Sequence, residues 1–496
     1  MNGNERSDPA IVAAKPANEP GRPGKEWVER REGAKGNAAG PHGVRAQERA
    51  ASSSGIDRVR KAARERKEEK FTTLLHHIDA KLLRQAYHWL KRDAAPGVDG
   101  MTWEAYGEGL EARLSGLESR IHRGSYRAQP SLRAHIPKPD GRQRPLGIAA
   151  LEDKVVQRAV VEVLNAIYET DFLGFSYGFR PERGQHDALD ALAVGIESQA
   201  VNWILDADIR GFFDNISHEW VMRFVEHRVG DRRVLCLIRK WLMAGVVEDG
   251  VRQPATKGTP QGAVISPLLS NIYLHYVYDL WTEQWRQRHA HGAMIVVRYA
   301  DDTVVGFEHR ADAERFLADL RIRMAEFDLE LHPDKTRLIE FGKRAASDRA
   351  GCGDGKPETF DFLGFTHISA KTRNGKFQLR RVTISKRMRA KLHEVKDQLR
   401  RRRHQPIPEQ GRWLASVVRG HTAYYAVPAN YQAVDRFRSE VMWLWCRALR
   451  RRSQRHRLPW ARMYRLADRW LPPVRIVHPW PTDRFYATTQ GRSPVR

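Results

Sequence analysis

Two adjacent aspartates, Asp301 and Asp302, stand between two apolar runs in the stretch MIVVRYADDTVVGF (294–307). The β-branched residues on either side predict two strands of a tight β-hairpin with the aspartates at its tip. Two carboxylates this close repel each other, and each resists ionising beside the other unless cations lie between them. Carboxylates suit magnesium, which keeps positions for water and substrate phosphates. The pair therefore predicts a divalent-metal site, although an isolated Asp-Asp pair is more often a plain exposed turn.

A further carboxylate is available from an earlier predicted strand, WILDADI (203–209). Asp206 and Asp208 are two residues apart on it and so share one face. One of them beside the hairpin would complete a site for two ions, which can activate an attacking hydroxyl and stabilise the leaving oxygen of an in-line phosphoryl displacement. That is the chemistry of nucleotidyl transfer. The spacing alone leaves Asp206 and Asp208 as rivals.

The charge balance indicates the class of partner. The chain has 496 residues with 85 Lys and Arg against 60 Asp and Glu, a formal net charge of +25. Such an excess favours a polyanionic partner. Fourteen Trp and fourteen Tyr, many beside arginines, favour nucleic acid over a merely basic soluble protein. No apolar run approaches the roughly 18 residues that span a bilayer, so we expect no membrane partner.

Cysteine usage indicates the compartment. The three cysteines, Cys236, Cys352 and Cys446, lie far apart and form no CxxC pair. This pattern suits a reducing compartment and excludes a cysteine-rich zinc site. The N-terminus also lacks the apolar core of a secretory signal. We therefore expect a cytoplasmic protein.

The elements that must position these residues alternate irregularly. Residues 203–209 and both halves of 294–307 are expected as strands, whereas 71–93, 151–169 and 266–281 are expected as helices. Such a mixture predicts an α+β fold rather than a regular βαβ array.

The metal-site residues also lie in family motifs. YADD (299–302) resembles the catalytic box of reverse transcriptases, and DIRGFFDNISH (208–218) resembles an earlier motif of group II intron reverse transcriptases. The resemblance implies that Asp208, Asp301 and Asp302 bind two Mg²⁺ ions, with help from the carbonyl group of Ile209. It also implies that Phe213 lies under the incoming sugar and excludes a ribose 2′-hydroxyl. Asp206 stays the local rival for the metal.

Two further blocks resemble the nucleotide-binding motifs of the same family. HIPKPDGRQRPLGI (135–148) would place Lys138 and Arg144 toward the incoming triphosphate, with a solvated basic hairpin as the alternative. TPQGAVISPLLSNIYL (259–274) would place Gln261 and Gly262 beside template and nucleotide.

Three other blocks complete the resemblance in the polymerase part. LELHPDKTRLIEFG (329–342) implies that Lys335 protonates the pyrophosphate leaving group, with an ordinary salt bridge as the alternative. SYGFRPERGQHDAL (176–189) implies a nucleic-acid contact for Arg180, and FDFLGFTHI (360–368) resembles the block that holds the primer.

The C-terminal part resembles the maturase domain of group II intron proteins. The stretches are WLASVVRGHTAYYAVPANYQAVDRF (413–437) and LWCRALRRRSQRHRLPWARM (444–463), with His421 where an aromatic residue is common. The expected RNA-binding residues are basic or aromatic: Arg419, Tyr424, Tyr425, Arg450, Arg451 and Arg452. At least one of the two tyrosines is also expected to be a core residue. Since the chain has no CxxC pair, we expect no His-Asn-His endonuclease domain.

The resemblance implies a right-hand polymerase with fingers, palm and thumb, followed by a helical maturase domain. The expected divisions are a disordered N-terminal extension (1–55), an N-terminal helical extension (56–125), fingers and palm (126–366), thumb (367–410), and maturase domain with C-terminal tail (411–496).

The implied function is that of a bacterial RNA-directed DNA polymerase, a nucleotidyltransferase, that also binds its group II intron RNA to assist splicing and intron homing. Its partners would be an RNA template, a DNA primer, deoxynucleoside triphosphates and target DNA. Two rivals stay open: a splicing-only RNA-binding maturase, and a reverse transcriptase repurposed for phage defence or diversification.

Overall fold

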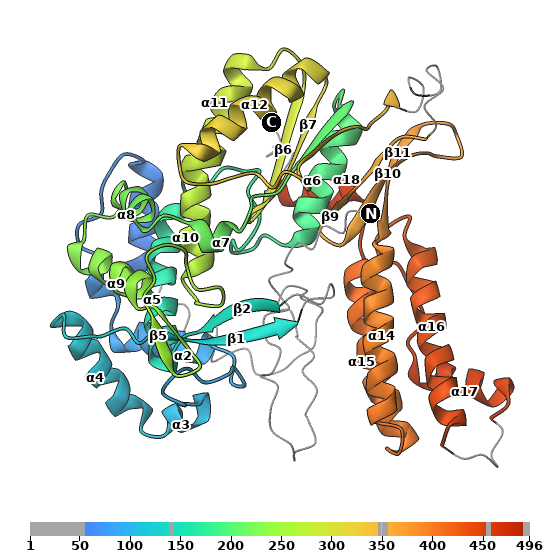
Figure 1. Cartoon of the computed structure of the whole chain (residues 1–496), viewed down its shortest axis with the longest axis horizontal. Coiled ribbons are helices and arrows are strands. Elements are labelled where there is room, and N and C mark those ends of the chain that lie inside the picture. The colour runs from blue at the N-terminus through green and yellow to red at the C-terminus, as the bar shows by residue number, and fades with distance from the viewer. Residues whose placement is uncertain (1–54, 138–142, 346–348, 350–355, 453–457, 490–496) are drawn as a thin grey trace.

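The computed structural model describes residues 55–137, 143–345, 349, 356–452 and 458–489. The expected N-terminal extension therefore lies almost entirely outside the described residues. Figure 1 shows a broad body of mixed helices and sheets, with a bundle of long helices standing at one side. This arrangement confirms the α+β class. None of the described helices combines the length and the apolar composition that a bilayer-spanning segment requires.

The N-terminal helices differ from the single helix expected over 71–93. The chain forms a 3₁₀ turn, η2 (Leu75–His77), and then α2 (Ala80–Trp89). Asp79 separates them because its side chain caps α2, accepting a hydrogen bond from Leu82 N over 2.7 Å. The apolar spacing was correct, since Leu75 is fully buried, but it did not reveal the cap. Two further helices, α3 (Trp103–Gly107) and α4 (Leu110–His122), complete this layer.

A four-stranded sheet comes next, in the order β2-β1-β4-β5. Its strands are β1 (Ser131–Pro137), β2 (Gln143–Ile148), β4 (Val246–Glu248) and β5 (Val251–Gln253). The helix expected over 151–169 is confirmed as α5 (Leu151–Tyr168). It is buried nearly all round, as its apolar composition on every face requires.

The second sheet carries the YADD hairpin and has the order β6-β7-β3-β8. Its strands, all antiparallel to their neighbours, are β3 (Trp203–Ala207), β6 (Met294–Tyr299), β7 (Asp302–Phe307) and β8 (Arg337–Glu340). One face packs with α6 (Gln185–Ser198) and the other joins the main core with α12 (Arg310–Ala325). Burial on both faces explains why β6 and β7 have continuous apolar runs.

The helix expected over 266–281 consists of three consecutive pieces. They are α10 (Ser266–Leu274), the π-helical segment η3 (His275–Asp279) and α11 (Leu280–His289). Three shorter helices lie between β3 and β4, namely α7 (Phe212–Asn215), α8 (His218–Glu226) and α9 (Arg232–Met243).

The C-terminal part begins with a three-stranded meander and continues as helices. These elements are β9 (Thr359–Phe362), β10 (Phe365–Lys371), β11 (Phe377–Thr383), α14 (Ser385–Arg401), α15 (Ile407–Tyr425), α16 (Tyr431–Arg450) and α17 (Trp460–Trp470). The division expected at 366/367 falls inside β10, and the one at 410/411 falls inside α15. Each division thus cuts through one element, since β10 pairs with β11 along its whole length and α15 packs against α16.

The last helix, α18 (Pro481–Thr489), returns to the palm and packs on α6 (Figure 1). Arg484 Nε lies 3.2 Å from Asp190 Oδ2 of α6, and Arg381 Nη1 of β11 lies 2.7 Å from Asp190 Oδ1. Phe485 is buried in the same core cluster as α6. Asp190 thus joins the palm, the meander and the C-terminal helix.

A buried histidine makes the stability of this C-terminal part depend on pH. Burial, with a smaller contribution from Lys391, lowers the pKa of His421 to about 3. The unfolded chain binds this proton below pH 6.5 and the folded chain does not, so stability falls as pH drops from 6.5. The loss reaches about 2 kcal/mol at pH 5. We expect His421→Phe, which keeps a ring against Phe437, to reduce the fall of the melting temperature between pH 6.5 and pH 4.5, while buried His275 and His367, whose pKa values are also lowered, keep part of it.

The control is His393→Gln, because the His393 side chain is 70% exposed. It should leave the pH profile of the melting temperature unchanged. Equal slopes for His421→Phe and the unmodified chain would contradict the assignment.

Candidate active site

The register between β3 and β7 determines where Asp208 lies. Ala207 pairs with Thr303, so the next step of this register places Asp208 opposite Asp302. Directly opposed residues of antiparallel strands share a face and have Cα atoms about 4.5–5.5 Å apart. We therefore expect Asp208 to lie beside Asp302 where the strand end meets the hairpin.

The turn of the hairpin has only two residues, Ala300 and Asp301, because Tyr299 pairs with Asp302. Ala300 has a φ of 57°, a left-handed conformation that costs a non-glycine residue about 1–3 kcal/mol. A β-carbon added at Gly178 would lie 2.2 Å from Ala300 N. Glycine at that position thus lets a neighbouring segment support the turn by close backbone contact.

Asp208 forms an ion pair with Lys335, whose Nζ lies 3.1 Å from Asp208 Oδ2. The backbone of Asp208 is fixed as well, since His332 N donates to Asp208 O over 2.7 Å. An isolated β-bridge between Ile209 and Leu331 continues this attachment. Lys335 therefore forms the salt bridge that the sequence offered as the alternative to proton transfer. Its partner in that salt bridge is Asp208, the expected catalytic carboxylate.

The donor set fits magnesium, although it is not assembled as a cage. In the described part of the chain, no three His, Cys, Asp or Glu side chains lie close enough to enclose a metal ion. The carboxylates of Asp208, Asp301 and Asp302 supply the hard oxygen ligands that Mg²⁺ prefers. The Lys335 ammonium also shows that the Asp208 carboxylate already binds a cation.

Asp206 does not fit the metal role. It is fully buried, with an exposed fraction of 0% against 8% for Asp208. It lies inside the sheet, opposite Val304 on one side and Arg337 on the other. Because Mg²⁺ must keep positions for water and substrate, Asp208 at the strand end is the better ligand.

The loop before α10 connects the nucleotide-side residues to β2. Gly147 N on β2 donates to Gln261 O over 2.7 Å. Gly262 has a φ of 110°, and a β-carbon there would lie 3.1 Å from Gly147 O. Glycine is therefore favoured at position 262, because other residues rarely adopt this φ and because a side chain would crowd Gly147 O. Arg144 lies three residues earlier on β2 and is half-buried, whereas Lys138 lies outside the described residues.

Phe213 lies on α7, immediately after the strand end that carries Asp208. Its carbonyl oxygen accepts a hydrogen bond from Thr259 N over 2.8 Å. This hydrogen bond attaches the loop that carries Gln261 to α7, next to the strand end that carries Asp208. The Phe213 ring is half-buried, with its centroid 5.4 Å from that of Phe212. The structure thus connects Asp208, Phe213 and Gln261 through short backbone links.

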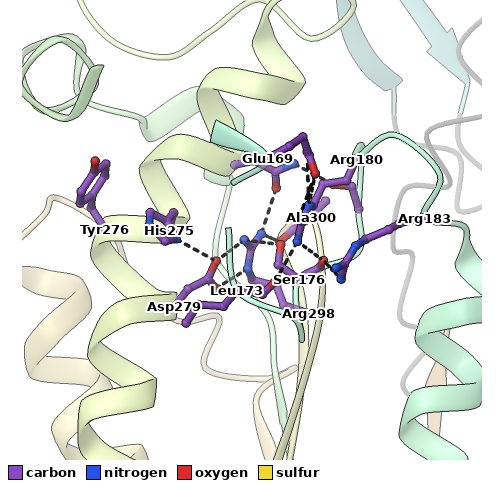
Figure 2. Close-up of polar contacts among 12 residues, drawn as sticks. Glu169, Leu173, Ser176, Arg180, Arg183, His275, Tyr276, Asp279, Arg298 and Ala300 are labelled. Carbon is purple, nitrogen blue, oxygen red and sulfur yellow. Dashed lines mark hydrogen bonds and ion pairs between the residues drawn. The ribbon is translucent and has the colours of Figure 1, made fainter. Parts of the chain in front are cut away.

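Arg180 does not fit the expected nucleic-acid contact. Its side chain is only 3% exposed and pairs with Glu169, with Nη2 2.9 Å from Oε2. Its Nη1 donates to the carbonyl oxygens of Leu173 and Ser176, both over 2.8 Å (Figure 2). That expectation is therefore wrong, because the guanidinium is consumed by contacts inside the protein.

Tyr424 and Tyr425 are core-packing residues rather than open stacking surfaces. Tyr424 OH donates to Leu363 O over 2.7 Å, and both rings pack against Phe365. They join the palm core cluster at half-buried positions. This packing agrees with the expectation that at least one of the two tyrosines is a core residue, and direct RNA stacking stays a prediction.

The expected RNA-binding arginines are divided between exposed and bonded positions. Arg419 and Arg451 are exposed. Arg450 Nη2 donates to Leu458 O over 2.9 Å, and Arg452 Nη2 donates to Gln405 O. The first two keep their guanidinium groups accessible to phosphate.

These arginines adjoin an exposed cluster whose rings Trp443 and Tyr464 were not singled out by the sequence. We call it the aromatic–arginine face; it consists of Trp443, Arg447, Arg450, Trp460 and Tyr464. The ring centroids of Trp443 and Trp460 are 4.9 Å apart, and the Arg450 guanidinium lies 5.2 Å from the Trp460 centroid. Trp443 is 49% exposed and Tyr464 52%. Residues 443, 447 and 450 are four and three positions apart, so they lie on one side of a helix. This spacing was the signal that the sequence offered for the cluster.

Comparisons with known proteins agree with this geometry. Residues 136–367 match the family model described as reverse transcriptase (RNA-dependent DNA polymerase). Protein YkfC of Escherichia coli K12 is 32% identical over 317 residues, which cover 57% of this chain and 78% of that protein.

Two relatives named for introns are also similar. The group II intron-encoded protein LtrA of Lactococcus lactis subsp. cremoris is 34% identical over 222 residues, covering 44% of this chain and 37% of LtrA. An uncharacterized 91 kDa protein in the cob intron of Schizosaccharomyces pombe is 32% identical over 257 residues, covering 52% of this chain and 30% of that protein. The chain therefore belongs to the group II intron reverse transcriptase/maturase family, whose polymerases are RNA-directed DNA polymerases.

Proposed function

We propose that this chain extends a DNA primer on an RNA template at a two-metal site formed by Asp208, Asp301 and Asp302. The observation that supports the proposal is the β3–β7 register, whose last pair, Ala207 with Thr303, leaves Asp208 directly after β3 and Asp302 at the start of β7. When bound, two Mg²⁺ ions would activate the primer hydroxyl and neutralise the leaving pyrophosphate. The turn presents Asp301 and Asp302 from a fixed backbone, and the β3 end presents Asp208.

The surrounding residues would bind the deoxynucleoside triphosphate. Arg144 on β2 neutralises phosphate charge, and Gln261 with Gly262 forms the backbone surface beside template and nucleotide. Lys335 would be freed from Asp208 by a metal bound there. Its Nζ can then donate a proton to the departing pyrophosphate oxygen.

We also propose that the C-terminal helices bind the group II intron RNA, assist its splicing and support insertion at target DNA. The aromatic–arginine face supports this proposal, because exposed rings stack on unpaired bases and arginines pair with phosphates. Arg419 and Arg451 would add phosphate contacts. The free thiols of Cys236 and Cys446 suit the proposed cytoplasmic location in a bacterium.

The first test of the metal site compares two neighbouring aspartates. We expect Asp208→Asn to lower DNA synthesis on an RNA template by about 100-fold or more, since a metal ligand contributes several kcal/mol to the transition state. Asp206→Asn is the matched control and should keep the unmodified chain's Mg²⁺ dependence. The measurement is primer extension across a Mg²⁺ titration. Absence of any synthesis by the unmodified chain would favour the splicing-only maturase.

The second test concerns the sugar. We expect Phe213→Ala to raise incorporation of ribonucleotides relative to deoxynucleotides by about 10-fold, because a removed clash is worth 1–3 kcal/mol. The measurement is kcat/KM for each nucleotide in single-nucleotide extension, with deoxynucleotide incorporation by the same variant as its internal control. An unchanged ratio would remove Phe213 from sugar selection.

The third test concerns RNA. We expect Trp443→Ala with Tyr464→Ala to weaken intron RNA binding and splicing by about 10- to 100-fold, because stacking is worth 1–3 kcal/mol per base. Extension of a generic primer–template should stay near the level of the unmodified chain. The control is Tyr431→Ala, since Tyr431 is also exposed on α16 but lies outside the aromatic–arginine face. Equal RNA affinity for all three proteins would contradict the assignment.

A further inference from the structure

Arg298, the residue before Tyr299 of the YADD motif, is completely buried, with an exposed fraction of 0%. A buried guanidinium is tolerated only when it is paired and its donors are satisfied. Arg298 meets this demand through Asp279, since Nε lies 2.7 Å from Oδ1 and Nη2 lies 2.6 Å from Oδ2 (Figure 2). The pair is bidentate, the geometry that fixes a guanidinium plane most firmly.

The remaining donors of Arg298 reach three other segments. Nη2 donates to Ser176 Oγ over 2.7 Å, and Nη1 donates to Asn271 Oδ1 over 3.0 Å. Nη1 also donates to Ala300 O over 2.9 Å. The five N–H groups of the guanidinium therefore match five hydrogen bonds. The Arg298 side chain therefore joins η3, α10, the segment around Ser176 and the YADD turn.

The acceptor Ala300 O belongs to the peptide group that joins Ala300 to Asp301. The turn has two residues, and Ala300 adopts the left-handed conformation without being glycine. A bond at this carbonyl oxygen therefore sets the orientation of the peptide from which Asp301 projects. Asp279 balances the positive charge of Arg298. Arg298 therefore acts on the turn through the geometry of its hydrogen bond to Ala300 O, not through a net electrostatic field.

The π-helical segment η3 places Asp279 for this role. A π turn shifts the side chains after it, and such segments occur frequently at functional sites. His275, at the start of η3, has its Nδ1 3.9 Å from Asp279 Oδ2. Burial lowers the pKa of His275 to about 4, so its ring is neutral at pH 7. Arg298, and not His275, is therefore the cation that balances the Asp279 carboxylate.

The segment 173–178 supports the turn from the other side. Arg298 N donates to Phe175 O over 2.9 Å, and Tyr177 N donates to Arg298 O over 2.8 Å. Asn271 Nδ2 donates to Gly178 O over 2.7 Å. Gly178 in turn makes the close backbone contact with Ala300. Arg298 and Asn271 therefore hold both sides of that contact.

We propose that Arg298 is a positioning residue for the metal-binding aspartates, fixing the turn that presents Asp301 and Asp302 through its bond to Ala300 O. The inference rests on the proposed metal site. Arg298 touches neither metal nor nucleotide, and it acts through the peptide group before Asp301. Asp279 keeps the guanidinium charged and oriented in the protein interior.

The test replaces the buried pair without leaving a lone charge. Arg298→Met with Asp279→Leu removes both ions, an exchange that buried pairs often tolerate in stability. We expect the double variant to fold and to bind RNA as the unmodified chain does. Its Mn²⁺ affinity and kcat should both fall by about 10- to 100-fold, the usual effect of losing a partner behind a metal ligand. KM for the nucleotide should change much less.

Mn²⁺ binding is measured by electron paramagnetic resonance on the full chain bound to an RNA template with a dideoxy-terminated primer, so that no turnover is needed. The matched control is Arg228→Met with Asp171→Leu. In that pair Arg228 is buried and the Asp171 side chain is 12% exposed, with Arg228 Nε 3.1 Å from Asp171 Oδ2, and Arg228 Nη1 donates to Arg66 O. The control should keep the Mn²⁺ affinity of the unmodified chain.

A folded double variant with unchanged Mn²⁺ affinity and kcat would overturn the proposal. If the double variant does not fold, the test uses Arg298→Lys, because one ammonium group cannot reach both Asp279 and Ala300 O. Unchanged Mn²⁺ affinity in Arg298→Lys would also overturn the proposal. Failure of both to fold, while the control pair folds, would show a purely structural role. Asp301→Asn must lose Mn²⁺ binding in the same assay. If it does not, the metal site itself is wrong, rather than the positioning role.

Discussion

The buried ion pair between Arg298 and Asp279 is the contact on which the geometry of the candidate site depends. The YADD turn is short and adopts a backbone conformation that alanine disfavours, so local propensity alone does not specify it. Arg298 joins this turn to η3 and to the segment around Ser176. Water is excluded from the cluster, so each of these hydrogen bonds is stronger than at a surface, and losing one partner costs more. The palm therefore presents its carboxylates from a rigid support.

A second buried carboxylate, Asp190, connects this support to the C-terminal helices. It pairs with Arg381 of β11 and with Arg484 of α18. Tyr424 of α15 reaches the same region through its bond to Leu363 O. The bundle is thus attached to the palm at its base, through β11, α15 and α18, whereas the aromatic–arginine face lies on α16 and α17. One chain can therefore present a polymerase site and an RNA-binding surface on separate elements that share a core.

Patterning predicted the elements whose signal is local. The hairpin over 294–307 and the helix over 151–169 follow from apolar repeats, and both are confirmed. The π-helical segment was not predictable, because a π turn leaves composition unchanged and shifts only the phase of the next helical residues. Burial of Arg180 was missed for another reason: its partner, Glu169, is set by tertiary contacts. The return of α18 onto α6 is likewise a long-range pairing. The metal assignment of Asp208, Asp301 and Asp302 stays a prediction.

The position of Lys335 connects metal binding to proton transfer. Its ammonium lies on Asp208 Oδ2, where it offsets the repulsion that the aspartates would otherwise exert on one another. In the proposed site, a divalent ion held by Asp208 with Asp301 or Asp302 would replace the ammonium as the counter-charge of Asp208. Lys335 would then stay protonated beside the site, where it could donate a proton to the pyrophosphate. Under the proposed function, the same residue would therefore stabilise the metal-free site and supply the proton in the loaded one, so the ion pair and the proton transfer are compatible roles of Lys335.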